Sequence, residues 1–127
     1  MIDHIIINVR NLSASFEFYR KALAPLGYSA TPEYTTGTGT KGFGFGLKGE
    51  HDFFIQQGAA QVTQCHIAFY ASTRAQVEEF YSAGLAAGGR DNGKPELTPD
   101  HGPDYYSAYV FDPDGYNIEV VCAEPVA

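Results

Sequence analysis

Cysteine, basic residues and long apolar runs are all scarce in this sequence. Its two cysteines, Cys65 and Cys122, are too few for a disulfide framework, so we expect two reduced, buried thiols. Only 8 Lys and Arg residues stand against 15 Asp and Glu, giving a net charge of −7. Without a basic cluster, nucleic acid and anionic membrane surfaces are not expected partners. No apolar run approaches the roughly 20 residues that a membrane-spanning helix needs.

Several catalytic and targeting motifs are also missing. The sequence has no Gly-x-Ser-x-Gly elbow, no phosphate-binding loop and no dinucleotide fingerprint. The N-terminus enters a predicted strand at once, without the basic and apolar regions of a signal peptide. Together with the reduced thiols, this predicts a cytoplasmic protein.

The composition that remains is typical of a folded globular protein. Hydrophobic residues make up 44% of the 127 positions, and nine Phe and nine Tyr supply large apolar side chains. This length predicts a single domain, residues 1–127.

The sequence repeats itself with a shift of 62 positions. Two predicted strands that open with a histidine, at His4 and His66, begin the two copies. The identical pairs are His4/His66, Ile5/Ile67, Glu17/Glu79, Phe18/Phe80, Tyr19/Tyr81, Leu23/Leu85, Ala24/Ala86 and Gly27/Gly89. The repetition predicts one structural unit built twice, as half-modules 1–60 and 61–127.

Each half is predicted to have the order β-α-β-β-β. In the first half we expect a strand at 2–9, a helix at 12–23 capped by Asn11, a strand at 28–34 that is interrupted at Pro32, and strands at 42–47 and 52–57. In the second half we expect a strand at 65–71, a helix that begins with a Thr73–Gln76 capping box, a polar loop at 90–103, and strands at 105–111 and 117–122. The fold class is therefore α+β, with two curved, mainly antiparallel sheets and a helix packed on each.

Glycine alternates with large apolar residues at 42–47. We expect this glycine face to lie against bulky groups or a ligand.

Three residues have the chemistry of metal ligands: His4, His66 and Glu119. A pseudo-twofold arrangement predicts that the two histidines face each other across a shared cleft. Strand alternation directs Ile118 and Val120 to the core and Glu119 to the opposite face. Two imidazoles and a carboxylate form a facial set that leaves metal positions open for substrate. The alternative is two ordinary buried histidines and an exposed strand glutamate.

A shift of 63 instead of 62 makes Gln56 the repeat partner of Glu119 and a candidate fourth ligand or substrate contact. The one-residue slip leaves Gln57 as an alternative, and either residue is equally well explained as a surface strand end.

The loop that enters the strand at 105–111 supplies other candidates. His101 is a candidate acid or base, and Tyr105 and Tyr106 are candidate hydrogen-bond donors to substrate. Tyr70 shares the predicted face of His66 and is a further substrate-binding candidate. The alternative is a solvated loop followed by core tyrosines.

These motifs together resemble the vicinal oxygen chelate superfamily, which groups glyoxalases, bleomycin-resistance proteins and dioxygenases. The resemblance rests on residues 2–5, on Asn11-Leu12 with Phe18-Tyr19, on residues 65–69 and, most specifically, on residues 112–119. It implies paired βαβββ modules that form a cupped site around a divalent ion (Zn, Ni, Mn or Fe(II)), with His4, His66 and Glu119 at the family's ligand positions.

The resemblance also implies a function. We expect a metal-dependent enzyme of the lyase/isomerase or dioxygenase type, acting on a small oxygenated substrate through direct chelation. The assigned roles are catalysis for Glu119, His101 and Tyr106, and substrate binding for Tyr70, Tyr105, Tyr106 and Gln56. The alternative is a protein that sequesters a drug-like or aromatic ligand without turnover. A homodimer is expected in either case.

Overall fold

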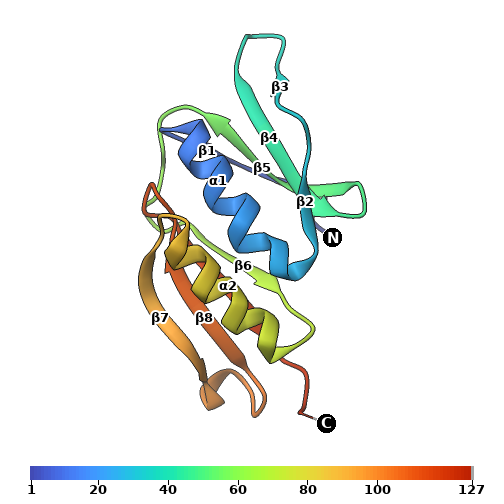
Figure 1. Ribbon diagram of the computed structural model, residues 1–127, viewed down its shortest axis with the longest axis vertical. Coiled ribbons are helices and arrows are strands. Elements are labelled where there is room, and N and C mark those ends of the chain that lie inside the picture. Colours follow the sequence, from blue (N-terminus) through green and yellow to red (C-terminus); the bar gives the residue numbers. More distant parts are fainter. Residues whose placement is uncertain (127) are drawn as a thin grey trace.

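The computed structural model describes residues 1–126 and contains the two predicted modules (Figure 1). The first consists of β1 (Ile5–Val9), α1 (Leu12–Leu23), the 3-10 turn η1 (Ala24–Leu26), β2 (Tyr28–Ala30), β3 (Tyr34–Thr35), β4 (Lys41–Leu47) and β5 (Glu50–Gln57). The second consists of β6 (His66–Tyr70), α2 (Arg74–Ala86), β7 (Arg90–Leu97), the 3-10 turn η2 (Pro99–His101), β8 (Tyr106–Phe111) and β9 (Asn117–Cys122). The domain predicted from the sequence extends to residue 127, which lies outside the described part.

Each module forms its own sheet. The N-terminal sheet has the order β1-β5-β4-β2, with β3 also paired to β4, and the C-terminal sheet has the order β6-β9-β8-β7. In each sheet the first and last strands of the module are parallel neighbours, and the other pairs are antiparallel. The shared topology confirms the α+β fold class with two βαβββ units.

Local sequence explains where both helices begin. The Asn11 side chain accepts the backbone N–H of Ala14 at 3.1 Å, which satisfies one of the free donors of α1. Thr73 and Gln76 form the expected capping box at the start of α2. The first module's helical segment ends at Gly27, whose φ of 87° suits glycine.

The segment 90–103 differs from its prediction as a loop, because most of it is strand β7. The Asn92-Gly93 and Pro95 signals mark irregularities in the β7–β8 pairing, which shifts register between Asp91 and Gly93 and again before Glu96. An edge strand tolerates proline and bulges because one side of it needs no ladder hydrogen bonds. The predicted interruption of the strand at 28–34 is confirmed, since β2 and β3 lie on either side of Pro32.

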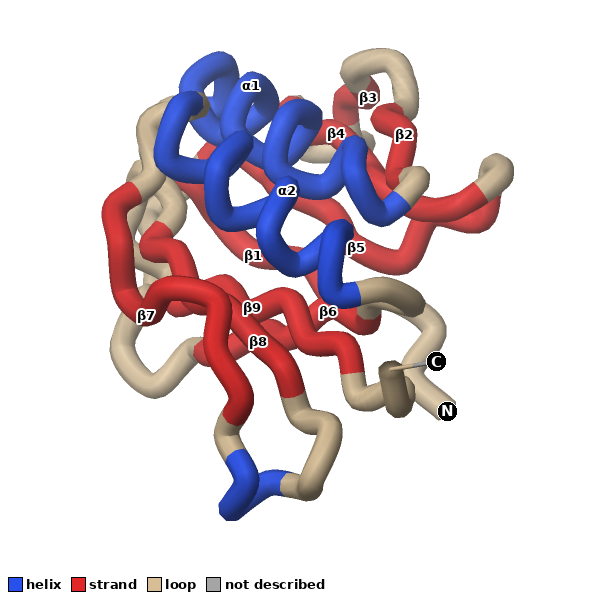
Figure 2. Tube along the Cα trace, turned by 60° about the horizontal axis from the view of Figure 1, so that its bottom comes forward, coloured by secondary structure: helices blue, strands red, loops and turns tan. Residues whose placement is uncertain are grey.

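Both helices pack into one continuous core. The rings of Phe53 in the first module and Phe69 in the second meet edge to face, with centroids 5.2 Å apart. Phe18 of α1 also packs against the second module at Gly89. Its ring lies so close to this glycine that a Cβ built there would be 2.7 Å from Phe18 Cε1. Figure 2 shows α1 and α2 side by side, with the two sheets as separate layers. Because the helix-covered faces share this core, the opposite face of each sheet is turned away from it.

Polar contacts also join the modules near the turn at 112–115. Asp112 is buried and accepts a hydrogen bond from the hydroxyl of Tyr19 on α1. Its other oxygen accepts backbone N–H groups of the turn, including that of Tyr116 at 2.8 Å. The Tyr116 hydroxyl in turn donates to the carbonyl oxygen of Asn8 at 2.6 Å.

Neither helix within residues 1–126 has the length and apolar character that a membrane-spanning helix needs.

Candidate functional site

His66 and Glu119 meet on the open face of the C-terminal sheet. Parallel pairing of β6 and β9 sets His66 opposite Asn117 and Ala68 opposite Glu119. His66 Nε2 lies 2.8 Å from Glu119 Oε1. Ile118 and Val120 are fully buried on the other face, as strand alternation predicted.

The Glu119 carboxylate is almost completely buried, with a relative exposure of 3%. Its second oxygen accepts a hydrogen bond from the Tyr105 hydroxyl at 2.6 Å. Burial, followed by this hydrogen bond, raises the pKa of Tyr105 above its ordinary value of 10.0, so the phenol stays protonated and remains a donor. His66 and Tyr105 therefore orient the carboxylate from two sides.

Tyr106, assigned to the site from the sequence, lies on the opposite face of β8. Its register partner is Cys122, which faces the helix-covered core. Its hydroxyl donates to Glu78 of α2 at 2.9 Å, and the Arg74 guanidinium lies 5.2 Å from its ring centroid. The structure therefore does not bring Tyr106 to Glu119, and its catalytic and substrate-binding roles stay predictions that this location does not support.

His4 lies in the other half of the molecule. It precedes β1 and lines a hollow of about 340 Å³ on the open face of the N-terminal sheet, together with Tyr34, Phe54 and Gln56. Its Nδ1 is 2.6 Å from Asp3 Oδ1, and its ring is 5.7 Å from that of Phe54. Among residues 1–126 of one chain, no three His, Cys, Asp or Glu side chains gather to hold a metal. A single chain thus does not bring together the predicted His4, His66 and Glu119.

The strand registers identify the true counterpart of Glu119 in the first module. Ile6 and Ala68 are related by the 62-residue repeat, and Ala68 pairs with Glu119 whereas Ile6 pairs with Phe54. Phe54 therefore occupies the position equivalent to Glu119, and the pairing of Gln56 with Glu119 was wrong by two residues. A phenylalanine supplies no ligand atom, so the equivalent position holds an aromatic ring beside His4.

The remaining candidates have other neighbours. Gln56 donates from Nε2 to the Tyr34 hydroxyl at 3.0 Å. Gln57 instead joins β5 to α1, where it accepts from the Leu12 N–H at 3.0 Å and donates to the Arg10 carbonyl at 2.6 Å. It is therefore a connecting residue rather than a site residue.

Tyr70 and His101 lie near the C-terminal module's open face. Tyr70 is 60% exposed, and its hydroxyl donates to Glu124. Exposed His101 lies in η2, with its ring 5.1 Å from that of Tyr105. His101 therefore adjoins the tyrosine that holds Glu119, rather than Glu119 itself.

Sequence reasoning missed Tyr34 and Phe54 as site residues. The alternating glycines were the signal that could have found them. A Cβ on Gly42 would lie 2.6 Å from the Tyr34 hydroxyl, and one on Gly44 would lie 2.6 Å from Phe54 Cε2. The expectation that the glycine face lies against bulky groups is confirmed, and those groups are the two rings.

The donor chemistry of the C-terminal face suits a divalent cation. A buried carboxylate is costly without a compensating positive charge. Within the described residues, the ion-pair partner of Glu119 is His66, which is charged only when protonated. An imidazole and a carboxylate at this separation are two ligands of the kind that Zn²⁺ and related ions take. These two residues are two of the three members of the predicted ligand set, and His4 is the third.

Comparisons with known proteins agree with this architecture. The model of the glyoxalase/bleomycin resistance protein/dioxygenase superfamily matches residues 1–120. A glyoxalase/bleomycin resistance protein from Albidiferax ferrireducens is 26% identical, with 97% of this chain and 98% of that chain covered and a TM-score of 0.77. A search of curated proteins finds no match.

Two more distant structures share the fold. The fosfomycin resistance protein FosX from Listeria monocytogenes is 20% identical, with 98% and 92% of the two chains covered and a TM-score of 0.67. A glyoxalase I variant from Zea mays is 20% identical, with 94% of this chain and 46% of that chain covered and a TM-score of 0.73. At these identities the likeness concerns the fold alone.

Proposed function

Because the chain belongs to the glyoxalase/bleomycin resistance protein/dioxygenase superfamily, we propose that it is a divalent-metal-dependent enzyme acting on a small oxygenated molecule. The observation that carries this proposal is the His66–Glu119 pair, a 2.8 Å contact to a carboxylate that is only 3% exposed. Such a carboxylate is a preorganised ligand, and within residues 1–126 its ion-pair partner is a histidine and not a permanently charged Lys or Arg.

In this proposal His66, Glu119 and His4 hold the ion. When bound, a divalent ion supplies Lewis acidity that stabilises negative charge on chelated substrate oxygens. Tyr105 fixes the orientation of Glu119 through its hydroxyl. His101, beside Tyr105 and exposed to solvent, is positioned as the proton carrier between the site and water. The reaction is of the lyase/isomerase or dioxygenase type.

We further propose that a second copy of the chain supplies the missing histidine. β1 pairs only with β5 and β6 only with β9 within the described residues, so each of these strands has one edge without a partner. Large apolar side chains are exposed on or beside these edges, with relative exposures of 48% for Ile6 and 60% for Tyr70. Unpaired strand edges with apolar side chains favour association. A homodimer that pairs β1 of one copy with β6 of the other would carry His4 to the His66–Glu119 pair.

Mixing two variants tests both parts of the proposal. His4→Ala and His66→Ala should each abolish stoichiometric metal binding, measured by elemental analysis after loading with Zn, Ni, Mn or Fe(II). In a heterodimer of the two variants, one site regains both histidines and the other lacks both. Equimolar refolded mixtures should therefore recover about one quarter of the wild-type sites, because half of the dimers are mixed. No recovery despite a dimeric state would refute the shared site.

The alternative function, sequestration of an aromatic or drug-like ligand without turnover, is favoured by the ring-lined hollow beside His4. Wild-type protein that binds none of the four metals would remove the enzyme proposal and leave this one.

A further inference from the structure

The hollow over the N-terminal sheet has the composition of a binding site for an aromatic group. It measures about 340 Å³, and its walls include His4, Ile6, Tyr34, Phe54 and Gln56. The rings of Tyr34 and Phe54 meet edge to face at 6.1 Å, and Phe54 meets His4 in the same way at 5.7 Å. Aromatic groups pack favourably against such edges and faces.

Glycines in β4 fix where these walls lie. Gly42 and Gly44 leave room for the side chains of Tyr34 and Phe54 to rest directly on the strand backbone. Any side chain at Gly44 would push the Phe54 ring outward, since a Cβ there would lie 2.6 Å from Cε2. The hollow therefore depends on glycine at this position.

Tyr34 and Gln56 give the hollow neutral hydrogen-bonding groups that are complementary to an oxygen-bearing ring. The Tyr34 hydroxyl accepts from Gln56 Nε2 at 3.0 Å, which leaves its own proton available to a ligand. Within residues 1–126 that hydroxyl donates to no other group, so a ligand oxygen is its natural acceptor.

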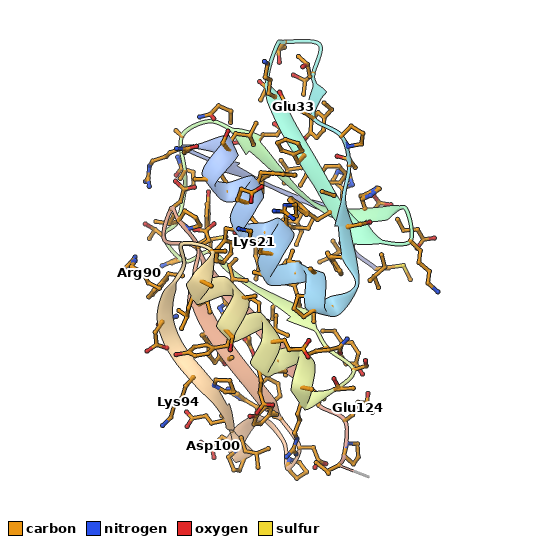
Figure 3. All side chains as sticks on the ribbon, viewed as in Figure 1. Lys21, Glu33, Arg90, Lys94, Asp100 and Glu124 are labelled. Atoms are coloured by element: carbon orange, nitrogen blue, oxygen red, sulfur yellow. The ribbon has the colours of Figure 1, made fainter. Side chains whose placement is uncertain are left out.

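Charge in the hollow opposes an anion. Among residues 1–126, no Lys or Arg lines the hollow. Its ionisable groups are Asp3, His4 and His51, and Asp3 Oδ1 lies 2.6 Å from His4 Nδ1, so the one carboxylate of the hollow already faces an imidazole. The chain as a whole carries −7. Three of the eight Lys and Arg residues can be followed in Figure 3: Lys21 is on α1, and Arg90 and Lys94 lie along β7 in the other module. If a ligand carboxylate enters the hollow without a cationic partner, its desolvation free energy is not offset by an ion pair.

We propose that this hollow binds an uncharged aromatic ring carrying a hydrogen-bonding oxygen, and that it rejects ligands with a carboxylate or phosphonate at that place. The inference rests on the proposed function, because it names the part of the substrate that lies beside His4. Phe54, at the position equivalent to Glu119, gives this half of the site a hydrophobic wall in place of a ligand.

Benzamide and benzoate form a matched pair for the test, because they share size and planarity and differ in charge. Binding is measured on the full chain in EDTA, by calorimetry and by shifts of Tyr34, Phe54 and Gln56 resonances. Benzamide should bind in the hollow at least about tenfold more tightly than benzoate. Equal or tighter binding of benzoate, or shifts that avoid these residues, would overturn the proposal.

Variants locate the binding. Tyr34→Phe should weaken benzamide binding by about three- to tenfold through loss of the donor. Gly44→Ala should abolish it by displacing the Phe54 ring, provided that circular dichroism shows the fold retained. Tyr81→Phe is the matched control, since its hydroxyl donates to Asp91 in the other module. An effect of Tyr81→Phe equal to that of Tyr34→Phe would contradict the assignment. Because no metal is present, failure here is distinct from failure of the metal site.

Discussion

Tyr105 and Tyr106 offer a direct test of how the site is organised. The two tyrosines are adjacent, and each donates a hydrogen bond to a carboxylate, but one carboxylate is buried and the other is exposed. Tyr105 donates at 2.6 Å to Glu119, which is 3% exposed, whereas Tyr106 donates at 2.9 Å to Glu78 on the exposed side of α2. The same substitution to phenylalanine removes one hydroxyl in each case and keeps the ring. Their effects should differ because only one acceptor has no access to water.

The magnitudes follow from the two environments. Loss of a hydrogen bond to a buried carboxyl group costs about 1.5–3 kcal/mol, so we expect Tyr105→Phe to lower the free energy of unfolding by about 2 kcal/mol. Loss of an exposed contact costs below about 1 kcal/mol, because water replaces the hydroxyl of Tyr106. With an m-value of about 1–3 kcal/mol/M in urea, Tyr105→Phe should lower the unfolding midpoint by about 1 M.

The measurement is urea unfolding of both variants in EDTA, monitored by circular dichroism. Equal midpoint shifts, or a larger shift for Tyr106→Phe, would refute the argument that Tyr105 supports a buried carboxylate. With metal added, Tyr105→Phe should also weaken metal affinity by about 10- to 100-fold, since Tyr105 orients Glu119, the proposed ligand. Tyr106→Phe should leave the affinity unchanged.

Three further predictions concern the fold. Asp112→Ala should cost about 3 kcal/mol or more in urea unfolding, because Tyr19 and the turn amides lose a buried acceptor; a cost near zero would disprove the link between modules. Burial raises the pKa of Tyr28 from 10.0 to about 12, so its stabilising effect is complete below pH 10 and is lost toward pH 12. Tyr28→Phe should therefore flatten the loss of stability over that range, and identical pH profiles would contradict this. Thr73→Ala should cost about 1 kcal/mol by removing the cap of α2, with the loss seen as a lower thermal midpoint.

Local signals in the sequence determined the elements with good accuracy. The predicted helix at 12–23 matches α1 at both ends, and both capping residues are confirmed. These features depend on residues within one or two turns of each other, so they can be recognised without knowledge of the fold. The edge strand β7 was missed because its bulges carry the same glycine and proline signals as a loop.

Alternation along single strands determined which face each residue occupies. It correctly separated Glu119 from Ile118 and Val120, because successive side chains in a strand point to opposite sides wherever the strand lies. Tyr105, which precedes β8, and Tyr106, which opens it, donate to different carboxylates, although we predicted both for one site. The two tyrosines were grouped because their side chains have the same chemistry, whereas their successive positions in the chain direct them to different faces.

Only the tertiary structure decided how the parts of the site are related. The register of β1 on β5 made Phe54, and not Gln56, the counterpart of Glu119, and a register depends on pairing between distant segments. The packing of both helices into one core turned the His4 and His66 faces away from a common cleft. The 62-residue repeat thus determined that the chain holds two similar modules with a histidine at the same place in each, while long-range packing determined that within residues 1–126 of one chain the two histidines do not meet.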